Sequence, residues 1–410
     1  MVLCAASGSP ALADPLGPEA AKLDQERLAP GIYPAAPAPQ DSTVATERSD
    51  PPFKLDWSVG LKGSHISSSD GNSFLTTLNP RLSASHDGRR TDWALEAGAE
   101  LARTGDGSLG LTALELDLRA STLLDHDTSL NGTAALDLTQ TLPGLPGGNP
   151  VVTQAPLETS GALTGAIDRR LGRFKLGIEG SVERTVHGPS TRTDTGVTDN
   201  SDQNVWEGDA RLRLGLQATP VFEIFGEAEL GRDWFDRAAA DGMRRDATSR
   251  ALRAGLAGDW NGLLKGSVSV GVGRHDFDDV GLADISAQLY DASLTYSPDP
   301  TVNLSASVST AIEPAGADAN GTARVIHRVA ANADYTVNSW LRLRASADWS
   351  QSWLEGSGES ERRHGLGAGA DYRINSRTAL SADYGYAHRD NSASGVFDSH
   401  TVSLGVTLQR

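Results

Sequence analysis

The sequence has one cysteine, Cys4, in 410 residues, and this scarcity excludes a disulfide framework and any metal site rich in cysteine. Basic residues are also few, because 36 Lys and Arg stand against 53 Asp and Glu and give a formal net charge of −17. Nucleic-acid binding needs a basic face, so this charge argues against it. No run of about 18–20 apolar residues is present, which excludes a membrane-spanning helix.

The sequence is rich in segments in which apolar and polar residues alternate. In "GSVSVGVG", residues 266–273, valines alternate with serines and glycines, so a strand here has one apolar face and one small polar face. The same period of two recurs in 18 segments from Phe53 to Leu408, and no segment shows a convincing helical period. The pattern predicts an all-β chain.

The connections between these segments alternate in length. Short ones such as "RRLGR", "TPV" and "TVNS" separate long ones such as "HGPSTRTDTGVTDNSDQN" and "EPAGADANG". Outer-membrane barrels have short periplasmic turns, long outer loops and an even number of strands, whereas a soluble sandwich has no reason to sort its loops. The sequence therefore predicts a transmembrane antiparallel up-and-down β-barrel of about 18 strands (16–18), with its apolar faces toward lipid.

Aromatic residues make up only 6% of the chain, but they concentrate near the ends of the predicted strands. Phe174, Phe222 and Trp340 lie beside short turns, and Trp206 and Trp234 lie beside long loops. This distribution is typical of two sparse aromatic girdles at the lipid–water interfaces.

The first 52 residues differ from the rest. Ala11-Leu12-Ala13 is an A-x-A cleavage pattern, so residues 1–13 are predicted to be a truncated signal peptide. Residues 14–52 are rich in Pro and Ala, lack a period, and are predicted to form a disordered periplasmic linker. The barrel itself is predicted to span residues 53–410.

Two segments resemble known outer-membrane proteins. The stretch "NPRLSASHDGRRTDWALEAGAELARTGDG" resembles proteobacterial porin-like barrels, a family with some members encoded near exopolysaccharide genes. The last strand, "HTVSLGVTLQR", resembles the terminal strand that the barrel assembly machinery reads, except that Arg410 stands where an aromatic residue is expected. The resemblance implies a location in the outer membrane of a Gram-negative bacterium, with lipid, lipopolysaccharide and the assembly machinery as partners, and leaves a homo-oligomer open.

If the apolar faces point to lipid, the charged residues at the alternate positions line the lumen. The predicted lumen-lining acidic sector comprises Asp92, Glu96, Glu100, Glu115, Asp117, Glu223, Glu227, Glu229 and Asp233. The predicted basic sector comprises Arg324, Arg328, Arg342 and Arg344. On opposite sides of a pore the two sectors would produce a transverse field that orients dipolar solutes, and the alternative is a solvated wall with incidental ion pairs.

The loop "TLPGLPGGNPVVTQAP", residues 141–156, contains no charged residue, four prolines and three glycines. Such a loop suits a packed position against the barrel wall, so it is a candidate constriction loop. Its candidate residues are Leu142, Pro143, Leu145, Pro146, Val151 and Val152. The alternative is an outer loop that contacts lipopolysaccharide or a partner.

The predicted function is a porin-like channel for passive diffusion of small hydrophilic solutes. The first alternative is a structural or accessory barrel linked to exopolysaccharide export, and the second is a barrel enzyme. The sequence contains no H-E-x-x-H, G-x-S-x-G or P-loop motif, so we predict no enzyme activity, no catalytic residue, no metal and no cofactor.

Overall fold

The computed structural model describes residues 53–410, apart from 106, 108, 143–151, 240–241 and 315–322. Eighteen long antiparallel strands form one sheet that closes on itself. This confirms the predicted barrel, and each of the 18 predicted segments overlaps one barrel strand. The barrel strands are β1 (Phe53–Ser68), β2 (Gly71–His86), β3 (Thr91–Thr104), β4 (Leu109–Leu123), β5 (Thr128–Thr139), β7 (Glu158–Leu171), β8 (Phe174–His187), β11 (Val205–Gln217), β12 (Phe222–Phe235), β13 (Ala247–Trp260), β14 (Leu264–Phe277), β15 (Ile285–Asp299), β16 (Val302–Pro314), β17 (Ala323–Asn338), β18 (Leu341–Leu354), β19 (Ser360–Asn375), β20 (Thr378–Asn391) and β21 (Gly395–Gln409).

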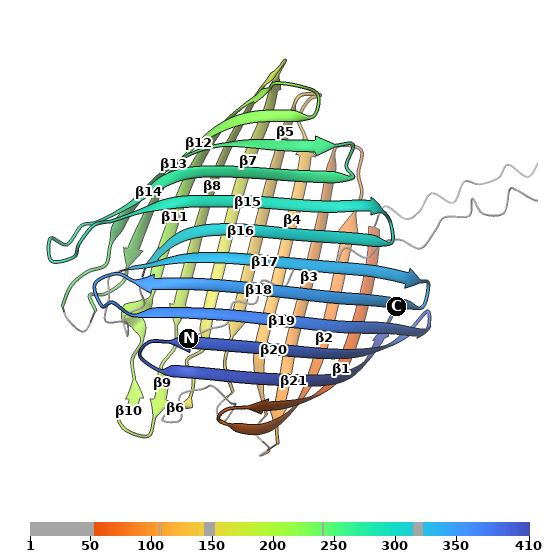
Figure 1. Cartoon of the computed structure of the whole chain (residues 1–410), viewed down its shortest axis with the longest axis vertical. Helices are drawn as coiled ribbons and strands as arrows, with labels where there is room; N and C mark the ends of the chain where they lie inside the picture. The colour runs from red at the N-terminus through yellow and green to blue at the C-terminus, as the bar shows by residue number, and fades with distance from the viewer. Residues whose placement is uncertain (1–52, 106, 108, 143–151, 240–241, 315–322) are drawn as a thin grey trace, which may run out of the picture. The chain divides into compact units, whose positions relative to one another are not determined.

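The last strand closes the barrel against the first. β21 pairs with β1 from Ser68↔Ser399 to Ser58↔Gln409, and the Arg410 amide donates a hydrogen bond to the Trp57 carbonyl. All other neighbours follow the order of the chain, which is the up-and-down arrangement visible in Figure 1. Arg410 therefore stands at the closing seam without preventing closure.

The connections divide the barrel into two ends. One end carries residues 140–157, 188–204, 236–246 and 278–284, and we call it the long-loop end. The other end carries turns of two to four residues throughout, such as Gly172–Arg173, which confirms the predicted short turns. The alternation of lengths is not strict, because residues 69–70 and 392–394 at the long-loop end are also short connections: the strands there extend into stretches predicted to be loops. In Figure 1 the long-loop end of β14 to β20 is on the left.

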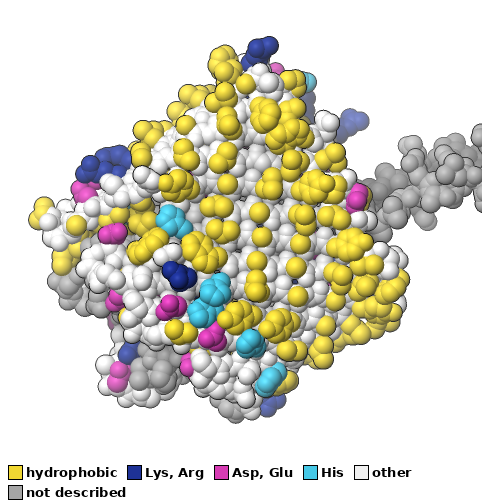
Figure 2. Space-filling view, viewed as in Figure 1, with side chains coloured by type: hydrophobic (Ala, Val, Ile, Leu, Met, Phe, Trp, Pro, Cys, Tyr) yellow, Lys and Arg dark blue, Asp and Glu magenta, His cyan; other side chains and the backbone are white. Residues whose placement is uncertain are grey.

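Two different faces result from the period of two. Leu252, Val270 and Leu366 are among many large apolar side chains that stay more than half exposed, and they share one parity along their strands. An exposed apolar surface of this extent has no place in water, so it is the lipid-facing surface. Figure 2 shows these apolar side chains spread over the strands that face the viewer, with charged and histidine side chains gathered toward the long-loop end.

Exposed aromatic rings mark both ends of the apolar surface. At the short-turn end the rings of Phe222 and Trp260 pack edge to face at 5.1 Å, and those of Trp340 and Tyr372 do so at 5.2 Å. Trp206 and Trp234 are exposed on the same surface near the long-loop end. The structure thus places aromatic residues where the sequence predicted two girdles.

Three short strands lie outside the barrel. β6 (Val152–Gln154), β9 (Ser190–Arg192) and β10 (Gly196–Thr198) form a small sheet, and the short helix η2 (Ser201–Gln203) follows them. Because β6 pairs with β9, the loop after β5 is joined to the loop after β8. No helix in the part of the chain that the structure describes is long and apolar enough to cross a membrane. The predicted signal peptide and linker, residues 1–52, lie outside that part and stay predictions.

Candidate functional site: the barrel lumen

By the parity of their strands, the charged residues predicted to line the lumen lie on the face opposite to the exposed apolar one. Glu223, Glu227, Glu229 and Asp233 all alternate with the exposed Ile224 and Leu230 of β12, so they project to the opposite side of the wall. By the same parity, Asp92, Glu96, Glu100, Glu115 and Asp117 project inward from β3 and β4, and Arg324, Arg328, Arg342 and Arg344 project inward from β17 and β18.

Ion pairs join many of the charged side chains on the lumen face, beginning at the short-turn end of β12, and these particular pairs were not predicted from the sequence. The sequence showed no base on the lumen face of β12, but neighbouring strands supply several. Glu223 accepts from Lys175 at 2.5 Å and from Arg213 at 3.2 Å, and Glu229 accepts from Arg253 at 2.6 Å. Further pairs join Arg211 to Glu179 and Glu229, and Arg253 to Glu227 and Asp291.

The basic sector is neutralised in the same way. Arg328 pairs with Glu313 at 2.7 Å, and Arg342 pairs with Asp334 at 2.7 Å. Arg344 contacts both Asp371 at 2.9 Å and Asp383 at 2.8 Å. Three of the four predicted arginines therefore balance nearby carboxylates, which weakens the positive side of the predicted transverse field.

Towards the long-loop end, acids meet other acids. Glu207 of β11 stands directly across from Glu183 of β8 and from Asp233 of β12. Directly paired residues in an antiparallel sheet have Cβ atoms about 4.5–5.5 Å apart. None of the three forms an ion pair with Lys or Arg within the described residues. We call Glu183, Glu207 and Asp233 the acidic row.

A second acidic pair lies further round the barrel. Glu115 of β4 is in register with Asp137 of β5, and Asp117 lies two residues further along β4. No Lys or Arg of the described chain forms an ion pair with any of these three carboxylates. Together with the acidic row they leave one side of the lumen negatively charged, facing a largely neutralised side.

The sequence reasoning missed Glu183, Glu207, Asp209 and Asp137. The parity that identified Asp233 applied to them equally, but only the register of the strands shows which acids face other acids. Among the residues that the structure describes, no group of three or more metal-ligating side chains converges on one point. The acidic row is therefore a spread of charge along the wall.

His275 of β14 lies next to Asp233, at one end of the acidic row. Its ring is almost fully buried, lies 3.7 Å from the Asp233 carboxylate and packs edge to face on Phe277 at 4.8 Å.

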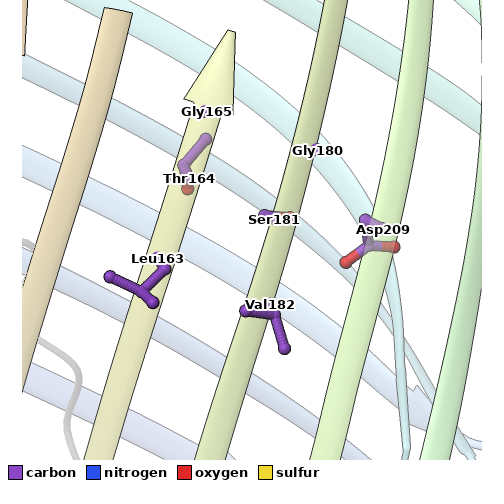
Figure 3. Close-up of a pocket in the computed structure, with 7 residues that line it drawn as sticks. All are labelled: Leu163, Thr164, Gly165, Gly180, Ser181, Val182 and Asp209. Atoms are coloured by element: carbon purple, nitrogen blue, oxygen red, sulfur yellow. The ribbon is translucent and has the colours of Figure 1, made fainter.

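A shallow depression interrupts the wall beside the acidic row. Figure 3 shows its lining, which includes Leu163, Gly165, Gly180 and Asp209. Gly165 and Gly180 pair across β7 and β8, and neither has a side chain to fill the surface. The depression is therefore a thin place in the barrel wall rather than a ligand pocket.

The candidate constriction loop is described only at its two ends. Leu142 is buried, and its side chain packs close to Gly110 of β4. Val152 begins β6, and the Gln140 side-chain amide donates a hydrogen bond to the Ala155 carbonyl at 2.9 Å. Pro143, Leu145, Pro146 and Val151 lie outside the described residues.

The fold defines the class of protein: a transmembrane β-barrel of the outer membrane of Gram-negative bacteria. Residues 56–410 match the family described as "Putative beta-barrel porin 2", and the chain belongs to that family. It is therefore a porin-like channel protein, as the resemblance in sequence implied. No curated protein matches the chain.

Several solved barrels are similar to it at low identity. The outer-membrane protein OpdK of Pseudomonas aeruginosa is 10% identical, with a TM-score of 0.42 over 87% of this chain and 99% of its own. OccK2 (OpdF) of the same organism, solved in complex with glucuronate, is 10% identical, with a TM-score of 0.44 over 87% and 98%. The FrpB iron transporter of Neisseria meningitidis is 10% identical, with a TM-score of 0.42 over 82% and 62%.

Proposed function

We propose that this porin-like channel favours cationic and dipolar hydrophilic solutes over anions. The observation that carries the proposal is the acidic row, whose three carboxylates stand in direct register and form no ion pair with Lys or Arg among the described residues. The basic sector on the far side is mostly paired, so it offsets little of this charge. The proposal includes no catalytic step and no cofactor.

The size of the preference follows from Coulomb's law. A cation about 8 Å from one fully ionised carboxylate in water gains about 0.5 kcal/mol, so three full charges set an upper limit of about 1.5 kcal/mol. That energy corresponds to roughly tenfold enrichment of a monovalent cation. Salt at about 1 M shortens the Debye length to about 3 Å, so the preference is expected at low ionic strength.

Reversal potentials in a KCl gradient test the proposal. We expect the channel to pass K⁺ better than Cl⁻, and the triple variant Glu183→Gln, Glu207→Gln, Asp233→Asn to lose most of that preference. The matched control is Asp390→Asn, which removes a carboxylate from the outer face of β20 near the same end. An unchanged ratio in the triple variant would refute the role of the acidic row.

We also propose that the outer face at the long-loop end contacts lipopolysaccharide. Arg184, Arg232, Arg250 and Arg274 project outward from β8, β12, β13 and β14, and each contacts at least one aspartate. Arg250 and Arg274 stay well exposed. Arginine is suited to phosphate because its planar fork donates two parallel hydrogen bonds.

Thermal unfolding with and without purified lipopolysaccharide tests this contact. We expect Arg250→Ala with Arg274→Ala to abolish most of the stabilisation that lipopolysaccharide gives. The control is Arg173→Ala in a turn at the other end. Equal stabilisation of both variants would contradict the contact.

A further inference from the structure

The seam between β15 and β16 differs from its neighbours. The two strands pair from Ala292↔Val308 to Asp299↔Val302, and there the ladder stops. On its other side β15 stays paired with β14 up to His275↔Ile285, and β16 stays paired with β17 up to Pro314↔Ala323. Residues 285–291 and 309–314 thus face each other without a backbone ladder, and we call this stretch the half-seam. Figure 1 shows the two strands separating toward the long-loop end.

Side chains close the half-seam in place of backbone hydrogen bonds. Ile285 and Leu289 alternate with the exposed Tyr290 and so project toward the lumen, yet they are only 5% and 3% exposed. Ile285 forms one buried cluster with Ala323 and Val325, and Ile312 packs against it.

The partners of Ile285 come from the opposite face of the wall. Ile312 has the parity of the exposed Val308, and Val325 has the parity of the exposed Val329, so both belong to the outer face. Thr310, also on that face, is only 3% exposed. The inner face of β15 therefore packs against the outer face of β16 and β17, so the two edges of the wall overlap here.

This overlap explains how the half-seam is tolerated in a membrane. Unpaired backbone groups do not face lipid, and they persist at membrane depth only where protein covers them or where they line water. The overlap supplies that cover. Within the described residues, separating β15 from β16 here breaks side-chain contacts but no backbone ladder, whereas separating a fully paired seam also breaks a row of backbone hydrogen bonds.

The two sides of the half-seam differ in chemistry. On the lumen side β17 presents Arg324 and Arg328, and one carboxylate, Glu313, is bound to Arg328 at 2.7 Å. Between the layers lie Ile285, Leu289 and Val325. Arg324 forms no ion pair with a carboxylate among the described residues, so it is the free cation on the lumen side of the half-seam. A cation, an apolar layer and then lipid form a sequence of environments that suits a molecule with an anionic head and an apolar tail.

We propose that the half-seam is a lateral passage through which single-chain amphiphiles with an anionic head move between the lumen and the outer leaflet. This function goes beyond diffusion of hydrophilic solutes along the barrel axis. It depends on Arg324 of β17 and on the apolar layer beside it, whereas the preference for cations along the axis depends on the acidic row of β8, β11 and β12. The lateral passage and the axial channel can be refuted independently, because a crosslink across the half-seam leaves diffusion along the barrel axis unchanged.

A disulfide lock tests the passage. Ile285→Cys with Val325→Cys joins the two layers, and Ser267→Cys with Ser293→Cys is the matched control, because those hydroxyls lie 2.8 Å apart in the fully paired β14–β15 seam. Both are made with Cys4→Ser. Uptake of radiolabelled dodecanoate is measured in cells that lack their own fatty-acid channel, and uptake of a small sugar is measured in parallel.

We expect the lock to reduce dodecanoate uptake several-fold, a reductant to restore it, and sugar uptake to stay unchanged. The control lock is expected to change neither. Dodecanoate uptake that is equal in the locked and control variants, or no faster than in cells without the protein, would overturn the proposal. Hydrogen exchange gives a second measurement that needs no crosslink: alternate amides of residues 309–314 should exchange faster than those of the β14–β15 seam, and equal protection would also overturn it.

Discussion

Val270→Arg tests the assignment of the two faces of the wall. Val270 lies near the middle of β14, pairs with Ala254 and Tyr290 on the neighbouring strands, and is 56% exposed on the outer face. Six residues separate it from the start of the strand at Leu264. At about 3.4 Å per residue and a tilt of about 40°, that places it about 15 Å from the end of the strand along the barrel axis, close to the bilayer midplane.

The expected cost is the free energy of placing a charge at that depth. Arginine at the midplane of a barrel destabilises the folded state by about 2–4 kcal/mol, which changes the unfolding equilibrium roughly 30- to 700-fold. Its long side chain reduces this cost to the extent that the guanidinium reaches the interface.

The control is Ser267→Arg, on the same strand but projecting into the lumen. Ser267 is partly exposed there and exchanges a hydrogen bond with Ser293, so the arginine reaches water at the loss of one weak contact. Urea titration of folding into phospholipid vesicles measures both variants. Equal stability of the two would show that the faces are assigned wrongly.

Three further predictions concern loops and orientation. Deleting residues 143–151 keeps β6 and should raise single-channel conductance if the loop narrows the lumen; unchanged conductance in a normally assembled protein would place the loop outside the pore. The Arg184 guanidinium, 2.5 Å from Asp236, holds the pKa of that carboxyl below its usual range, so the contact that holds loop 236–246 to the barrel should persist as pH falls through the ordinary aspartate range and be lost only below it. Protease sensitivity of the loop against pH reports this, and release at the ordinary aspartate pKa would contradict it. Val197→Cys in a long loop should be labelled in intact cells by an impermeant reagent and Leu263→Cys in a short turn should not, with both made in Cys4→Ser; the reverse pattern would invert the predicted orientation.

The barrel could be predicted from the sequence because each of its strands carries its own signal. A lipid-facing strand needs an apolar residue at every second position, and the turns need short polar sequences, so the number of strands and the short turns at one end were visible without contacts. The half-seam was not visible in this way. In β15 the apolar positions change face between Leu289 and Tyr290, but this change alone does not show which two strands separate. The loss of pairing arises from how β15 and β16 are placed relative to each other.

The charge environment of the lumen residues could not be predicted from the sequence either, because it depends on which strands are neighbours and on their register. Alternation predicted the lumen side for Glu223 and Asp233, but not their surroundings: Glu223 is bound by Lys175 and Arg213, whereas Asp233 stands beside Glu207. Glu207 and Asp209 precede Arg211 and Arg213 on one strand and read as a balanced segment, although register separates the acids from the bases. Ser269 is similar, since its small polar side chain predicts an exposed lumen position, yet it is only 7% exposed.

Planar-bilayer recording of the refolded full-length protein tests the central claim most directly. A water-filled, porin-like barrel should insert in discrete conductance steps, and at low salt those steps should carry K⁺ in preference to Cl⁻. Preparations that are folded by heat-modifiability on gels but give no steps would contradict the claim that this barrel is a channel.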